Sequence, residues 1–374
     1  MMALRQSVES VVRLRKTVPT SWMTTGSLLA WSAIFLAPPA YSATPPWNAV
    51  PKPPLVATAA PRILLIYDME GLSGQDGIDD TVPANPAYPA GQRLLTDDVN
   101  AVVAGLFQGG AGSVTVVDGH GSSSQIDILV DQLDPRAKMV ARDETSENAS
   151  TYDAIAIVGM HAGSGSGGFA AHTWTAGVEF KINGYALNEA ELIGLTHGEQ
   201  GLPVIFVSGD DRLGTELRSM PWIEYVTIKQ ATGVRSAVLV PLPEARRRLT
   251  LGAQQSLRRL PNARLMQVSQ PVRASVTAFA PADLQWLAAV PGIRYQDQTV
   301  SFDATDARTA YRGMEAIGGA AMRGYGDALY RAIKSSPDAR SIELRAIAEW
   351  DAKWVASERE LARQRGNDKY QASR

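Results

Sequence analysis

The sequence of 374 residues contains no cysteine and only four histidines. The absence of cysteine excludes a disulfide scaffold, metal sites with thiolate ligands and a thiol nucleophile. Charge is nearly balanced, with 36 Lys and Arg against 38 Asp and Glu, so nothing indicates nucleic-acid binding, which needs clustered cationic side chains. Apolar residues make up 45% of the chain, which is enough for a sizeable core. Histidine chemistry must come from His120, His161, His172 or His197.

Residues 1–42 are typical of a secretory signal peptide. Four basic residues precede a short apolar run at 28–37, which is followed by two prolines and by Ala40-Tyr41-Ser42, a small-x-small cleavage site. The apolar run is too short to span a bilayer comfortably. We therefore expect an exported protein, periplasmic or secreted, with no stable membrane span after cleavage; an uncleaved anchor is the alternative. Residues 43–61 are rich in proline and are expected to form an extended tether.

Four apolar, β-rich runs between residues 62 and 210 each stop abruptly at polar residues. Because these runs do not alternate with polar residues, we expect strands buried on both faces, as in a parallel sheet. Helical segments at about 95–109 and 189–201 fit between them, which is the α/β pattern. The sequence thus predicts an α/β fold, a mostly parallel sheet flanked by helices, with the site at the carboxyl ends of the strands. The runs are Ile63–Tyr67, Ser113–Val117, Ala154–Val158 and Pro203–Val207.

We place the α/β domain at residues 62–332 and a C-terminal helical extension at 333–374. Ser336 is expected to cap the final helix, with Pro337 at its first position, and the helix is expected to run to about Arg365. An apolar stripe at helical spacing predicts that this helix docks on its own domain or on a sister subunit; interfacial membrane contact through the two tryptophans is the alternative. The stripe consists of Ile347, Trp350, Trp354 and Leu361.

The polar residues at the strand ends suggest a metal centre. Asp68 and Glu70 are two residues apart, so they project to the same side of an extended chain, and two carboxylates brought together repel unless a positive charge separates them. His120 and His161 arrive at the same edge from neighbouring strands. Mixed carboxylate and imidazole ligands suit zinc, and also manganese or cobalt. If Glu189 is the third carboxylate and both imidazoles are neutral, the five side chains carry a charge of −3, which two divalent ions would nearly balance.

Other polar residues near this edge have less specific interpretations. Asp118 either orients an imidazole or caps its strand, and the Asp210-Asp211-Arg212 segment either binds substrate or forms a structural Asp–Arg pair. Lys229 either contacts a substrate carboxylate or is solvated. We interpret His197 as a cap near a helix C-terminus. The glycine-rich segment 163–168 matches a dinucleotide fingerprint only formally, and we interpret it as a mobile loop beside the site.

Several of these motifs, in the same order, resemble the zinc-dependent D-aminopeptidase family. The resemblance covers about residues 62–330 and leaves out the leader, the tether and the C-terminal helix. It is specific because the first motif is in register with both histidine motifs. The motifs are Tyr67-Asp68-Met69-Glu70-Gly71, Val117-Asp118-Gly119-His120, Gly159-Met160-His161-Ala162, Ala171-His172-Thr173 and Val207-Ser208-Gly209-Asp210-Asp211-Arg212.

The resemblance implies a dizinc site made by the five residues proposed above. It also implies that His172 is the catalytic histidine and that the chain forms a homo-oligomeric ring. Where the family usually has Gly-Glu-Leu-Gly, this chain reads Asn188-Glu189-Ala190-Glu191, so Glu191 competes with Glu189 for the last ligand position.

The expected function is hydrolysis of short peptides, with water activated by two zinc ions and with His172 as acid–base group or nucleophile. A preference for an N-terminal D-amino acid rests on the resemblance alone. Two alternatives remain. One is a metal-dependent amidase or esterase of other specificity, and the other is a non-catalytic exported protein that binds peptides.

Overall fold

The computed structural model describes residues 44–54, 60–121, 126–141 and 151–367. The expected signal peptide lies outside these residues, so it stays a prediction. Within the described ranges, no helix is long and apolar enough to cross a membrane.

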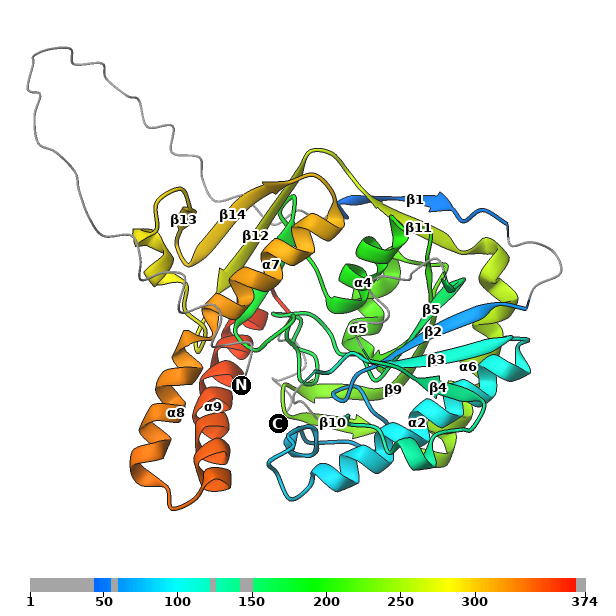
Figure 1. The fold of residues 1–374 in the computed structure, drawn as a ribbon, viewed down its shortest axis with the longest axis horizontal. Coiled ribbons are helices and arrows are strands. Elements are labelled where there is room, and N and C mark those ends of the chain that lie inside the picture. The colour runs from blue at the N-terminus through cyan, green and yellow to red at the C-terminus, as the bar shows by residue number, and fades with distance from the viewer. Residues whose placement is uncertain (1–43, 55–59, 122–125, 142–150, 368–374) are drawn as a thin grey trace, which may run out of the picture. The chain divides into compact units, whose positions relative to one another are not determined.

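The four apolar runs form the centre of a seven-stranded sheet, as predicted (Figure 1). They become β2 (Arg62–Tyr67), β3 (Ser113–Asp118), β5 (Ala154–Val158) and β8 (Val204–Asp210), which pair in parallel in the order β3-β2-β5-β8. Only the edge strand β10 runs antiparallel to its neighbour, which confirms the mostly parallel α/β fold. The complete order is β10-β9-β8-β5-β2-β3-β4, with β4 at Ala137–Met139, β9 at Glu224–Gly233 and β10 at Ser236–Leu239.

Both faces of this sheet are buried, which explains why its strands show no polar alternation. Ile63 and Leu65 of β2 contribute to one core, together with helices α2 (Tyr88–Gln108) and α6 (Leu242–Arg259). Leu64 of the same strand points into a second core, which includes helix α4 (Glu189–Gly198). The two expected helices are therefore present, although α2 begins seven residues earlier than predicted, with Pro89 in its first turn.

A second, antiparallel sheet was not predicted. It has the order β13-β14-β12-β6-β7, and helix α7 (Ala307–Ala321) packs against it. Asn183 and Gly184 form the two-residue turn between β6 and β7, and both have positive φ, as a tight hairpin of this kind requires. The strands are β6 (Val178–Ile182), β7 (Tyr185–Ala186), β12 (Val272–Ala278), β13 (Arg294–Gln296) and β14 (Thr299–Ala304).

Part of the expected tether is a strand instead. Trp47–Pro51 forms β1, which pairs antiparallel with β11 (Arg264–Val268), and Trp47 is buried edge-on against Tyr185. The segment is extended, as its prolines suggested, but it is fixed to the domain because the aromatic side chain at its start is buried.

The C-terminal extension consists of two helices that lie side by side, α8 (Arg323–Ser335) and α9 (Ala339–Gln364) (Figure 1). The proposed boundary at residue 333 falls inside α8. The predicted N-cap was also wrong by two residues: the Asp338 carboxylate accepts the Ser341 N–H at 2.9 Å and caps α9. Trp350 and Trp354 are both buried against the domain, so the docking interpretation holds and membrane contact through them is excluded.

The remaining helical elements of the described residues are short. They are helix α5 (Asp211–Glu216) and 3₁₀ turns at Asp79–Thr81, Val130–Gln132, Leu217–Ser219, Leu260–Asn262 and Gln285–Ala289.

Candidate metal centre

The segments at the ends of β2 and β5 are joined by backbone hydrogen bonds and lie at the base of the site. The Asp68 N–H donates to the Val158 carbonyl at 2.8 Å, and the Gly71 N–H donates to the Gly159 carbonyl at 2.7 Å. Gly159 has φ of +76°, and a Cβ there would lie 2.2 Å from the Asp68 carbonyl oxygen. Glycine at this position therefore lets the two ligand-bearing segments approach.

The structure brings the five proposed ligands together. His161 Nε2 lies 3.4 Å from Asp68 Oδ2 and 3.4 Å from Glu189 Oε1. His120 Nε2 lies 3.4 Å from Glu70 Oε1. Two overlapping sets of side chains present their donor atoms within 4.8 Å of one another: one is Asp68, Glu70 and His161, and the other is His161, Glu189 and the neighbouring His172.

The imidazoles of both proposed histidine ligands are held by their Nδ1 atoms. His161 Nδ1 lies 3.0 Å from the Ala162 carbonyl oxygen, and His120 Nδ1 lies 3.1 Å from Asp127 Oδ2. Since these partners only accept hydrogen bonds, each Nδ1 carries the hydrogen and each Nε2 faces the carboxylates. Such a contact to the outer nitrogen is typical of histidine that binds a metal. Asp127 is fully buried and also accepts a hydrogen bond from Tyr88 Oη.

The ionisation of these buried groups favours added positive charge at the centre. Burial and the neighbouring Glu70 carboxylate raise the pKa of Asp68 well above its ordinary value. Burial alone would lower the pKa of His161, but the Glu189, Asp68 and Glu70 carboxylates outweigh it and raise this pKa to about 10. Without metal, the groups therefore share protons. Divalent cations would replace those protons, so the donor set fits metal ions.

His172 lies beside the ligands in a different environment. Its ring stacks on that of His161, with ring centroids 3.9 Å apart and planes at 14°. Its Nδ1 donates to the Ala170 carbonyl oxygen at 2.7 Å, which leaves Nε2 facing Glu189 Oε1 at 3.9 Å. Burial, and then the charge on His161, lower the pKa of His172, so the ring is neutral near neutral pH. Its geometry suits an acid–base group and also allows metal ligation.

The structure distinguishes between the two candidates for the last carboxylate. Asn188 caps α4, and Glu189 is the first residue of that helix, where it accepts the Trp174 N–H at 2.6 Å. Glu191 points away from the centre: it closes the capping box with Asn188 and accepts a hydrogen bond from Tyr185 Oη at 3.0 Å. Glu189 is therefore the ligand candidate that the geometry favours.

Two of the less specific interpretations are decided in favour of structure. Asp118 Oδ1 accepts the Gly121 N–H at 3.0 Å, so it stabilises the turn after β3, while Asp127 orients His120. Asp210 caps α5 by accepting the N–H groups of Arg212 and Leu213, which is a structural role for this carboxylate. His197 lies in the last turn of α4 with its Nδ1 3.0 Å from the Ile193 carbonyl, in agreement with a structural role.

Lys229 and the glycine-rich segment differ from expectation. Lys229 is fully buried rather than solvated; it donates to the Glu70 carbonyl at 3.2 Å and to Gln75 Oε1 at 3.1 Å. Its ammonium also lies 4.2 Å from the Phe169 ring centroid, so it connects the Glu70 segment to the loop that carries His172. Residues 163–168, expected to be a mobile loop, are buried. Helix α9 covers them, as described below.

The comparisons with known proteins show the family of the chain. A family model described as D-aminopeptidase matches residues 62–316. A D-aminopeptidase of Bacillus subtilis (strain 168) is 29% identical over 275 residues, which cover 70% of this chain and 98% of the relative. The solved structure of the Zn-dependent D-aminopeptidase DppA from Bacillus subtilis, described as a self-compartmentalizing protease, matches with a TM-score of 0.65 at 25% identity, over 70% of this chain and 98% of that chain. The chain therefore belongs to the D-aminopeptidase family and is a metallo-aminopeptidase.

Proposed function

We propose that the protein removes N-terminal residues from short peptides, with a preference for D-residues, using two zinc ions held by Asp68, Glu70, His120, His161 and Glu189. The observation that carries the proposal is the convergence of three carboxylates and two Nε2 atoms beside the carboxyl ends of parallel strands, where Glu189 is contributed by the start of α4. When bound, zinc polarises a peptide carbonyl and lowers the pKa of water. The stereochemical preference is supported by the family and by the names of the two relatives.

His172 is proposed to move the proton. Its neutral ring has the Nε2 lone pair available, because Nδ1 is engaged with the Ala170 carbonyl. Nε2 takes a proton from the attacking water and then delivers it to the departing amine nitrogen, which leaves as a neutral amine. Direct attack by Nε2 as a nucleophile is the alternative role. Trapping of an acyl group on His172, detected by mass spectrometry, would favour that alternative.

The proposal is tested by a panel of dipeptides with N-terminal D-Ala or L-Ala, each with a form whose amino group is blocked. We expect zinc-dependent turnover of the free D-Ala substrate, and little turnover of the L-Ala and blocked forms. Hydrolysis of the blocked forms would instead indicate an amidase or esterase, and binding without turnover a peptide-binding protein. His172→Ala should lower kcat by about 10²–10⁴-fold while zinc content stays unchanged.

Two further proposals concern the assembly and location of the protein. Because the structural neighbour is described as self-compartmentalizing, we propose a homo-oligomer closed into a ring for this chain as well. Light scattering that finds a monomer would contradict it. Residues 1–42 support export to the periplasm or beyond. We expect N-terminal sequencing of the exported protein to begin at Ala43, and retention of the leader would contradict cleavage.

A further inference from the structure

Helix α9 packs against residues 163–172, the loop that carries His172. We call this segment the His172 loop. The Gly165 N–H donates to Glu358 Oε2 at 2.6 Å, and Arg365 Nη1 donates to the Ser164 carbonyl at 2.5 Å. Arg365 also forms an ion pair with the buried Glu179 of β6. Gly165 has φ of +76°, and a Cβ there would lie 2.4 Å from Arg365, so the loop and the helix are in close contact.

Trp354 of α9 reaches the His172 ring itself. The two rings meet edge to face, with centroids 6.0 Å apart and planes at 87°, within the range of a favourable aromatic contact. Trp354 is 4% exposed and shares a core with Phe169 and Ala170 of the loop. The His172 ring is therefore held on one side by His161 and on another by Trp354.

This contact comes from a part of the chain outside the family match. The family model ends at residue 316, whereas α9 spans Ala339–Gln364. The backbone of the loop also needs support, because Ala170, whose carbonyl holds His172 Nδ1, has φ of +50°, a conformation that a residue with a side chain rarely adopts. Packing from α9 supplies such support.

We propose that α9 contributes to the active site and that its residue Trp354 positions the His172 imidazole. The proposal rests on the proposed function of His172. Trp354 fixes the direction of Nε2 relative to Glu189, and the Glu358 and Arg365 contacts hold the loop against the helix. A small displacement of a group that transfers protons lowers the rate steeply, so loss of the Trp354 ring should reduce kcat more than it weakens substrate binding.

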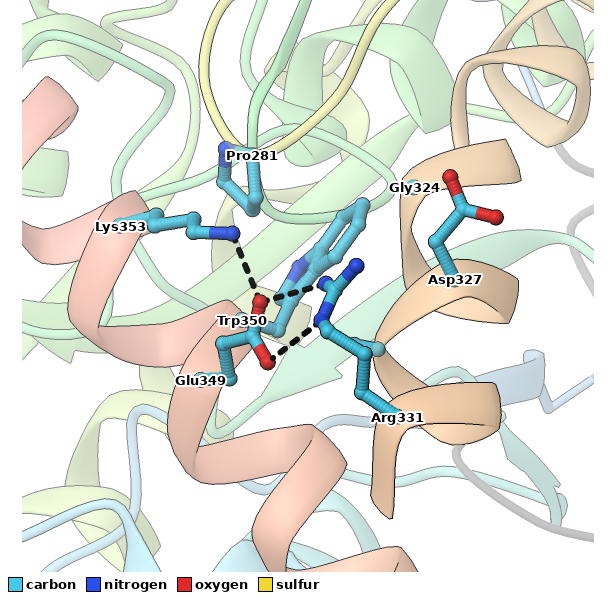
Figure 2. Close-up of a pocket in the computed structure, with 8 residues that line it drawn as sticks. Pro281, Gly324, Asp327, Arg331, Glu349, Trp350 and Lys353 are labelled. Atoms are coloured by element: carbon cyan, nitrogen blue, oxygen red, sulfur yellow. Dashed lines mark hydrogen bonds and ion pairs between the residues drawn. The ribbon is translucent and has the colours of Figure 1, made fainter. Parts of the chain in front are cut away.

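The same helix provides a matched control, Trp350. This residue is 6% exposed, so it is buried to a similar degree, but it packs edge-on against Tyr325 with ring centroids 5.7 Å apart. Figure 2 shows it among the residues that line a pocket between α8 and α9, where Arg331 pairs with Glu349. The volume of this pocket is about 200 Å³. Trp350→Leu thus removes a similar buried ring from α9 without touching His172.

We would compare the zinc-loaded Trp354→Leu, Trp354→Phe and Trp350→Leu proteins. We expect Trp354→Leu to lower kcat by about tenfold or more with KM little changed, Trp354→Phe to restore most of kcat, and Trp350→Leu to stay within about threefold of wild type. Equal effects of the two leucine variants on kcat would overturn the proposal. If Trp354→Leu does not fold, Trp354→Met, which keeps more side-chain volume, takes its place.

A second measurement does not depend on activity. In the metal-free proteins, the rate at which diethyl pyrocarbonate modifies His172, followed by peptide mass spectrometry, should rise at least about threefold in Trp354→Leu and not in Trp350→Leu. An unchanged rate in Trp354→Leu would count against the positioning role. The His172→Ala variant separates the two proposals. If His172→Ala keeps normal kcat, the proposed function fails. If His172→Ala is inactive but Trp354→Leu shows normal labelling and normal kcat, only the role of Trp354 is contradicted.

Discussion

At the scale of single residues, the site depends on groups that fix the orientation of the proposed ligands. His120 Nδ1 is held by Asp127, and His161 Nδ1 by a backbone carbonyl. Four of the ligand candidates were predictable because each closely follows an apolar strand, whereas Glu189 begins α4. Asp127 was not predictable, because the sequence before it has no periodic pattern and Asp127 reaches His120 only through the fold. Lys229 was expected either to contact a substrate carboxylate or to be solvated, and nothing in its sequence neighbourhood indicated a buried partner for its ammonium.

Asp127 gives the prediction at this scale. Asp127→Asn removes the charge that orients His120 while it keeps the size of the side chain, so we expect zinc affinity to fall by about 10–100-fold. Asp118→Asn, the matched control in the preceding turn, should leave zinc affinity within about threefold, because Asp118 Oδ1 accepts the Gly121 N–H and stabilises the turn after β3. Competition with a chelator of known affinity measures both. The same loss in both variants would show that Asp127 has no special role.

At the scale of secondary-structure elements, the parallel strands were predictable and the second sheet was overlooked. Yet β12 has a clear signal, since its residues alternate between buried and more exposed along Val272–Ala278, as a half-buried antiparallel strand does. The start of α9 was misplaced because Ser336 and Asp338 are both good caps, and the carboxylate of Asp338 makes the bond. The contact between α9 and the His172 loop joins residues far apart in the sequence, so local patterns could not reveal it.

Helix α9 gives a prediction about pH. Burial, opposed in part by the Gly165 N–H, raises the pKa of Glu358 to about 8 from an ordinary value of 4.5. Between these two values the folded protein holds a proton that the unfolded chain releases, so the free energy of unfolding should fall as pH rises, by about 1.4 kcal/mol per pH unit from this group. Glu358→Gln should remove that part of the slope in urea titrations between pH 5.5 and 8.

The control for this prediction lies on the same helix. Glu360 is exposed, and hydrogen bonds from Arg363 and Gln364 lower its pKa to about 2, so it is ionised throughout this pH range. Glu360→Gln should keep the wild-type slope. Glu191 and Glu216 also have raised pKa values and contribute slopes of their own, which cancel when variants are compared. Identical slopes for Glu358→Gln and wild type would contradict the assignment.

At the scale of the whole molecule, the carboxyl ends of β2, β3 and β5 lie at the same edge of the sheet. The segments that follow these strands supply four of the proposed ligands, and the start of α4 supplies the fifth. The topology of a parallel sheet brings these strand ends together. The apolar runs that predict the strands therefore also predict the edge at which the site lies. A chain without cysteine and with four histidines must hold zinc with carboxylates and imidazoles, and the structure gathers three of those histidines in one place.

A zinc titration of the metal-free protein, with bound zinc and release of D-Ala from a D-Ala dipeptide measured on the same samples, tests the central claim most directly. We predict that turnover appears as zinc binds and levels off at two zinc ions per chain. Glu189→Gln should reduce zinc binding and turnover together, while Glu191→Gln, on the same helix, should bind two. Full turnover in the metal-free protein, or wild-type zinc binding by Glu189→Gln, would contradict the account.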